Sequence, residues 1–243
     1  MIAIEPWQYR DGDLPLVGEI YRPTGPANGR GVLVVHEADG IGGNVRRRCI
    51  RLAEMGYIAA AADMHGHGRV LDGEEMLAAV AAFRDDPLRL RRRILAALDA
   101  MSATLSLGRA DIAAIGYCFG GMAVLELARS GAALAGVASF HGILTTRLAA
   151  EPGAISAPIM ASTGALDPLV PPEDVAAFQA EMTAARAAWH LLIHGGALHS
   201  YTNVDVDRLG DPRMAYDAAA DRQSWDALLS FFGTCFGADA APR

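Results

Sequence analysis

Cysteine is scarce in this chain, and the three present, Cys49, Cys118 and Cys235, stand far apart. An odd count at such intervals gives neither a Cys-x-x-Cys metal spacing nor a disulfide framework. This usage fits a reducing compartment. The sequence also lacks a basic segment followed by an apolar stretch at its start, so we expect no signal peptide. Together these absences favour a cytoplasmic protein.

The sequence also contains no long apolar run, few aromatic residues and fewer basic than acidic residues. The longest apolar stretches, such as residues 57–62, are far too short to span a membrane. Aromatic residues make up only 7% of the chain, and the net charge is −7, whereas nucleic-acid-binding domains usually carry a basic face. The arginine triplets at 46–48 and 91–93 have acidic neighbours and read as solvated helix faces. We therefore expect neither a membrane nor a nucleic-acid partner.

The sequence is rich in apolar residues, which are arranged in alternating blocks. At 52% hydrophobic over 243 residues, it can bury the core of one large α/β domain. Runs typical of buried parallel strands occur at residues 31–36, 57–62, 111–115, 135–140, 158–163 and 190–194. Helix-like segments lie between and after them, at residues 44–55, 74–83, 88–105, 122–129, 173–185 and 216–232. This alternation predicts a doubly wound, mostly parallel sheet with helices on both faces.

The two ends of the chain complete the expected organisation. Residues 1–30 should form a hairpin, turning at Asp11-Gly12-Asp13, and then a loop rich in proline and glycine. Residues 237–243 have the composition of a loose tail. Because no linker, repeat or low-complexity tract divides the sequence, residues 1–243 are expected to form a single domain.

The most informative motif is Gly116-Tyr117-Cys118-Phe119-Gly120-Gly121, which lies between a predicted strand and a predicted helix. This is the context of a nucleophile elbow, normally Gly-x-Ser-x-Gly, with cysteine in the serine position. The nucleophile of such an elbow sits in a strained turn, where side chains two residues away would clash with it. The N-terminus of the following helix favours the thiolate over the thiol.

Two polar side chains follow predicted strands further along, Asp167 after residues 158–163 and His199 after residues 190–194. Taken singly, an Asp-Pro pair is usually a turn, and a histidine in a glycine loop is usually a surface residue. The order Cys118, Asp167, His199 is more specific, because it is the chain order of the α/β-hydrolase triad. We therefore expect Cys118 to attack a carbonyl carbon, His199 to move protons and Asp167 to orient the imidazole.

Acyl transfer also needs hydrogen-bond donors for the developing oxyanion. Phe119 supplies one backbone N–H, and the loop after residues 31–36 should supply the other, from Ala38. Glu37 lies in the same loop, directly after a strand that reads as buried. Its carboxylate is therefore either paired or protonated there, or else exposed on the loop.

Several segments together resemble the dienelactone hydrolase family, the carboxymethylenebutenolidases. They are Val34-Val35-His36-Glu37, Met55-Gly56-Tyr57 leading to Asp63, the Cys118 elbow, Gly164 to Pro171, and His199-Ser200-Tyr201. The resemblance covers about residues 16–232 and implies an α/β-hydrolase that cleaves small esters or lactones. It also implies that Glu37 contacts the cysteine and helps to control its protonation. We expect no cofactor.

The chain departs from the family pattern where arginines hold the substrate carboxylate. After residues 57–62 only Arg69 is available for this role, and Asn203 stands where the second arginine belongs. Because a bidentate clamp supplies geometry as well as charge, its loss predicts that a substrate carboxylate is not strictly required. The side chains expected to line the substrate pocket are Tyr117, His65, His67, Arg69, Tyr201 and Asn203.

Other readings of the sequence stay open beside a cysteine-dependent hydrolase. One alternative is a catalytically weak α/β-hydrolase relative that acts as a small-molecule binding or regulatory protein. Another is an enzyme that catalyses a different reaction at the same site, such as carbon–halogen cleavage or thiol-dependent transfer. The pair His65 and His67 lacks the convergent spacing of a zinc site, so no metal is expected. The natural substrate and the oligomeric state do not follow from the sequence.

Overall fold

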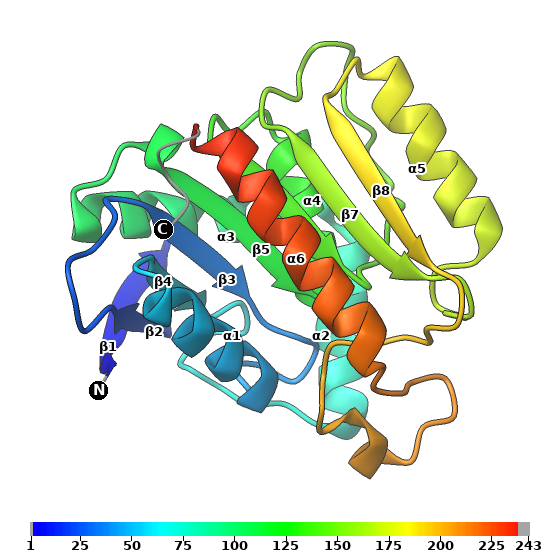
Figure 1. Ribbon diagram of the computed structural model, residues 1–243, viewed down its shortest axis with the longest axis horizontal. Helices are drawn as coiled ribbons and strands as arrows, with labels where there is room; N and C mark the ends of the chain where they lie inside the picture. Colours follow the sequence, from blue (N-terminus) through cyan, green and yellow to red (C-terminus); the bar gives the residue numbers. More distant parts are fainter. Residues whose placement is uncertain (1, 238–243) are drawn as a thin grey trace.

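The N-terminal hairpin forms one edge of an eight-stranded sheet in the computed structural model, which describes residues 2–237 (Figure 1). Strands β1 (Ala3–Asp11) and β2 (Leu14–Arg22) pair antiparallel. Gly12 sits in the turn between them with a φ of 59°, a left-handed conformation that glycine adopts without strain. The tail expected after Gly237 lies outside the described residues.

The remaining strands form the parallel part of the sheet. They are β3 (Gly31–Val35), β4 (Ile58–Ala62), β5 (Ile112–Tyr117), β6 (Gly136–Phe140), β7 (Ile159–Gly164) and β8 (Trp189–His194). The spatial order is β1-β2-β4-β3-β5-β6-β7-β8, and only the pairs formed by β2 are antiparallel. Every residue of β3, β5, β6 and β7 is buried, which explains their continuous apolar sequences.

Helices cover both faces of the sheet, as the alternating pattern predicts. Helices α1 (Gly43–Glu54) and α6 (Ala218–Cys235) lie on the face turned toward the viewer in Figure 1. The opposite face carries α2 (Gly73–Asp85), α3 (Pro87–Leu105), α4 (Phe119–Arg129) and α5 (Pro172–Ala184). The doubly wound fold is therefore confirmed. Among the described residues, none of the helices has the length and apolar character needed to cross a membrane.

The sheet separates two hydrophobic cores, because successive residues of a strand point to opposite faces. On β5, Ile112 and Ala114 pack toward α3 and α4, whereas Ala113, Ile115 and Tyr117 pack toward α1 and α6. The carboxyl ends of the parallel strands share one edge of the sheet. Between β3 and β5 the chain changes its winding direction, which is where α/β folds place their sites.

Candidate active site

Cys118 occupies a strained turn between β5 and α4. Its φ of 53° and ψ of −116° are unusual for a residue with a side chain, and such strain concentrates at functional sites. The flanking glycines make the turn possible. A Cβ on Gly116 would lie 2.0 Å from the carbonyl oxygen of Gly120, and one on Gly120 would lie 2.3 Å from that of Val35. The backbone therefore has the shape expected of a nucleophile elbow.

The structure brings Cys118, His199 and Asp167 together, although they come from three separate loops. His199 Nε2 lies 3.1 Å from Cys118 Sγ, and His199 Nδ1 lies 2.8 Å from Asp167 Oδ2. Asp167 Oδ1 also accepts the backbone N–H of Leu169 at 2.8 Å. His199 and Asp167 are almost fully buried. This geometry allows the imidazole to exchange a proton with the thiol while the carboxylate fixes its orientation.

Opposing effects set the pKa of His199. Burial acts to lower it, but the negative charge of Cys118 and the hydrogen bonds to Asp167 and Cys118 outweigh burial and raise the pKa to about 10. His199 therefore carries a proton beside the Cys118 sulfur at neutral pH. Because the folded-state pKa is raised above 6.5, the stability from this pair is complete below pH 6.5 and is lost as pH rises through about 10.

Glu37 lies half-buried directly after His36 at the end of β3. Burial, reinforced by the negative charge of Asp39, raises the pKa of its carboxyl to about 7. The side chain of Asn203 donates to Glu37 Oε2 at 3.0 Å, and the charges of His199 and Arg48 also favour the ionised form. Asn203 therefore holds Glu37, and this carboxyl changes its charge near neutral pH.

Two of the described backbone amides are left without a partner in the chain segments expected to form an oxyanion hole. Within the part of the chain that the structure describes, the N–H groups of Ala38 and Phe119 make no hydrogen bond to the protein. His65 contacts both residues: its Nε2 lies 2.9 Å from the Ala38 oxygen, and its ring stacks on Phe119 with centroids 5.9 Å apart. His65 thus supports both segments.

A cavity of about 260 Å³ lies next to this aromatic pair. Phe83, in its wall, has its ring centroid 5.6 Å from that of Phe119. The wall consists of Leu14, Met64, His65, Arg69, Leu71, Glu75, Ala79, Phe83, Arg89 and Arg93. Arg69 forms an ion pair with Glu75 there, so its charge is already partnered. The cavity suits a small ligand group.

Three residues expected in the pocket lie elsewhere. Tyr117 is 1% exposed and stacks on Phe140 in the core beneath α1 and α6. Tyr201 is fully buried, and its hydroxyl lies 2.7 Å from Ser162 Oγ. His67 is exposed, at a left-handed φ of 59°. Tyr117 faces the core because it shares the strand parity of Ala113 and Ile115.

His141 is a further residue of the site that was not expected from the sequence. It is completely buried at the end of β6, its Nδ1 accepts the backbone N–H of Cys118 at 3.1 Å, and its Nε2 lies 2.8 Å from Thr202 Oγ1. A usable signal existed, because a histidine directly after a buried strand beside the elbow strand lies at the same edge of the sheet.

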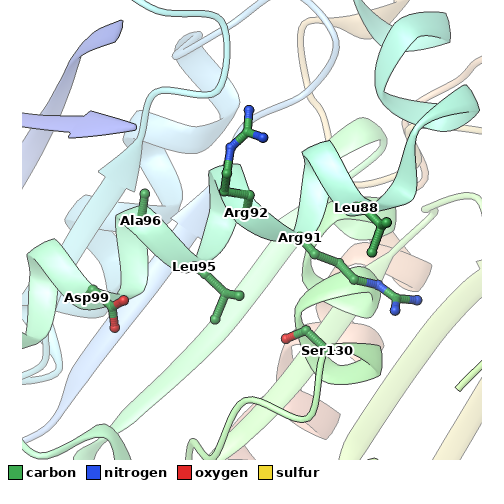
Figure 2. A pocket seen from close by; sticks show the side chains of 7 residues that line it. All are labelled: Leu88, Arg91, Arg92, Leu95, Ala96, Asp99 and Ser130. Atoms are coloured by element: carbon green, nitrogen blue, oxygen red, sulfur yellow. The ribbon is translucent and has the colours of Figure 1, made fainter. Parts of the chain in front are cut away.

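A shallower hollow of about 520 Å³ lies on the outer side of α3, against the far end of α4 (Figure 2). Its charged side chains are all partnered, by the ion pairs Arg91–Glu126, Arg92–Asp11 and Arg109–Asp99. Cys118 lies at the opposite end of α4, so this hollow is separate from the thiol. Among the described residues, no cluster of three or more histidine, cysteine or acidic side chains could hold a metal ion.

The doubly wound sheet, with a strained turn after β5 and histidine and acid loops after β8 and β7, defines the α/β-hydrolase class. Within this class, residues 16–236 match the family model described as the dienelactone hydrolase family. The chain belongs to that family. It is therefore a hydrolase that acts on carboxylic ester or lactone bonds.

The chain is similar to several known proteins. A dienelactone hydrolase-like promiscuous phosphotriesterase from metagenomic libraries is 37% identical, covers 97% of this chain and 99% of its own, and superposes with a TM-score of 0.91. The structure called m3DLH is 35% identical over the same shares, with a TM-score of 0.90. The uncharacterized protein K02A2.1 of Caenorhabditis elegans is 32% identical over 151 residues, which are 61% of this chain and 95% of that protein.

Proposed function

We propose that the chain hydrolyses small esters or lactones through a thioacyl-enzyme formed on Cys118. The observation that carries the proposal is the 3.1 Å contact between His199 Nε2 and the Cys118 sulfur in the strained turn. The thiolate attacks the carbonyl carbon, and the His199 imidazolium protonates the departing alkoxide. Neutral His199 then takes a proton from water, which attacks the thioester and expels the thiolate.

Asp167 and the two free amides support these steps. The carboxylate of Asp167 fixes the tautomer of His199 and stabilises its imidazolium form. The N–H groups of Ala38 and Phe119 supply donors for the tetrahedral oxyanion, which needs preorganised dipoles more than the ground-state carbonyl does.

The direct test is turnover of p-nitrophenyl acetate, followed by mass spectrometry of the quenched protein. We expect p-nitrophenolate release, an acetyl adduct on the peptide that contains Cys118, and loss of both after iodoacetamide treatment. Turnover without an adduct on that peptide would contradict the covalent route. If Cys118 alkylates normally but neither this ester nor a panel of lactones is hydrolysed, the binding or regulatory alternative is favoured.

A second candidate activity is hydrolysis of neutral phosphotriesters. It rests on the likeness, at 37% identity and a TM-score of 0.91, to a protein described as a promiscuous phosphotriesterase. A phosphoryl oxygen could use the same amide donors as a carbonyl oxygen. Release of p-nitrophenolate from diethyl p-nitrophenyl phosphate, compared with the acetate ester in one preparation, tests it.

Substrates without a carboxylate are expected to compete well with dienelactone. Arg69 is paired with Glu75, and Asn203 is bonded to Glu37, so neither residue offers a free bidentate clamp. We expect kcat/KM for a neutral lactone of similar size to lie within about tenfold of that for dienelactone, because a single solvated ion pair contributes little. A strong preference for the carboxylate substrate that disappears in Arg69→Ala would contradict this expectation.

Glu37→Gln is expected to change the pH profile of Cys118 alkylation by iodoacetamide. With the pKa of Glu37 at about 7, the wild-type profile should inflect near neutrality, because the carboxylate adds negative charge close to the thiolate and its imidazolium. Glutamine cannot ionise, so the inflection should vanish. An unchanged profile with unchanged turnover would leave Glu37 with a structural role.

The same substitution carries a prediction about stability. Between the ordinary glutamate pKa of 4.5 and about 7, the folded chain holds a proton that the unfolded chain has released. The contribution of Glu37 to the free energy of unfolding therefore falls as pH rises through this window. Glu37→Gln should remove that decline, which urea denaturation at pH 4.5 and pH 7.5 would measure.

A further inference from the structure

The turn after β6 places the ring of His141 against the Cys118 elbow at the cost of backbone strain. His141 has a φ of 40°, a left-handed value that residues with side chains seldom adopt. The next residue, Gly142, approaches so closely that a Cβ there would lie 2.6 Å from the backbone of Gly121 in α4. Such a conformation persists only where the surrounding structure holds it.

The hydrogen bonds of His141 fix its tautomer. The N–H of Cys118 is shared between the Phe140 oxygen at 3.0 Å and His141 Nδ1 at 3.1 Å. Because Nδ1 accepts this bond, the ring proton sits on Nε2 and is donated to Thr202 Oγ1 at 2.8 Å. Thr202 follows His199 by three residues, so one ring joins the backbone of the nucleophile to the segment that carries the base.

The surroundings keep this ring neutral. Burial, then the positive charges of His199 and Arg48, hold the pKa of His141 well below its ordinary value of 6.5. The ring centroids of His199, Tyr201 and Tyr117 lie 5.3, 5.2 and 6.0 Å from that of His141. A protonated ring would have no lone pair for the Cys118 N–H and would add a second cation beside His199.

We propose that His141 is a positioning residue: its neutral Nδ1 accepts the Cys118 backbone N–H and thereby holds the sulfur in contact with His199. Its effect on turnover rests on the proposed function, but its effect on the thiol does not. Without this acceptor the Cys118 N–H keeps only the Phe140 oxygen as its partner. The sulfur then makes a poorer contact with the imidazolium, and a smaller fraction of the thiol is ionised at a given pH.

Two substitutions distinguish the role of His141 as a hydrogen-bond acceptor from the role of its ring in packing. His141→Asn keeps an oxygen close to the position of Nδ1 and tolerates a left-handed backbone, but it removes ring volume from a fully buried place. His141→Phe keeps the ring volume and its packing on His199, but it offers neither an acceptor nor a donor. A role in packing alone would make Asn the more damaging change, whereas the proposed role makes Phe more damaging to the thiol.

The experiment measures iodoacetamide alkylation of Cys118 against pH, with Cys118→Ala as the blank for the other two thiols, together with the Tm of each variant. For His141→Phe we expect the midpoint of the profile to rise by about one pH unit, with an alkylation rate about tenfold lower at pH values below both midpoints. His141→Asn should stay within about threefold of wild type despite a lower Tm. Where wild type hydrolyses esters, kcat should follow the same order with little change in KM.

Three outcomes would overturn the proposal. They are an unchanged alkylation profile in His141→Phe, an equal loss in both variants, and a larger loss in His141→Asn that follows its Tm. Absence of ester hydrolysis by wild type would count against the proposed function alone, because the alkylation comparison is made on the thiol itself.

Discussion

Cys118→Ala should abolish ester and lactone hydrolysis, with a fall in kcat of about 10,000-fold or more, as for the loss of a nucleophile in other triads. The expectation follows from the position of the sulfur, 3.1 Å from His199 Nε2 at the tip of the strained turn. Without the sulfur no thioacyl intermediate can form, and the remaining amide donors act only on direct attack by water. Steady-state turnover of p-nitrophenyl acetate measures the loss.

Two controls make the result specific to the chemistry. The Tm of Cys118→Ala should stay within a few degrees of wild type, because the side chain is small and only half-buried. Cys118→Ser should be nearly as inactive as alanine, since a serine hydroxyl stays protonated where the thiol ionises and needs stronger base assistance. Near-normal turnover by a normally folded alanine variant would contradict a covalent mechanism.

The fold follows from the sequence because local and global signals agree. Alternating apolar runs and helical segments specify a parallel sheet covered on both faces, and the runs at residues 31–36 and 135–140 match β3 and β6 to within a residue. The spatial order of the strands, in contrast, does not follow from the sequence pattern. A β-α-β pattern does not state on which side of β3 each new strand is added, so the central position of β3 came from the structure.

The sequence predicts the site residues that directly follow strands. It does not predict hydrogen bonds between side chains that are far apart in the chain. Cys118, Asp167 and His199 each sit just after a strand, and parallel strands bring such residues to one edge. The pairing of Asn203 with Glu37 spans 166 positions, and no periodicity in the sequence encodes it. Asn203 was therefore expected to face the substrate, whereas its side-chain amide donates a hydrogen bond to the carboxylate of Glu37.

The placement of Tyr117 shows a recoverable error. Residues one apart in a strand face opposite cores, so the apolar Ala113 and Ile115 already assign Tyr117 to their side of the sheet. Proximity to the nucleophile in sequence therefore does not place Tyr117 beside the substrate. Tyr201 differs, because it lies in a loop without periodicity, and only the tertiary contact of its hydroxyl with Ser162 shows that it is buried.

His199→Ala and Asp167→Asn should each lower kcat by about 100- to 10,000-fold. Among the described residues, His199 makes the hydrogen bond to the sulfur, and alanine removes that base. In Asp167→Asn the amide N–H₂ would donate to Nδ1 in place of accepting from it. The ring proton would then move to Nε2, and the imidazole could no longer take a proton from water.

The asparagine variant also tests the ion pair between His199 and Cys118. Loss of the carboxylate removes one of the contacts that raise the pKa of His199 to about 10, so the imidazolium should give up its proton at lower pH and the alkylation profile of Cys118 should move toward higher pH. Because the three residues act as one unit, adding Asp167→Asn to Cys118→Ala should cost almost nothing further. If Asp167→Asn alone left both turnover and the alkylation profile unchanged, Asp167 would be a turn residue, and another acid would have to orient His199.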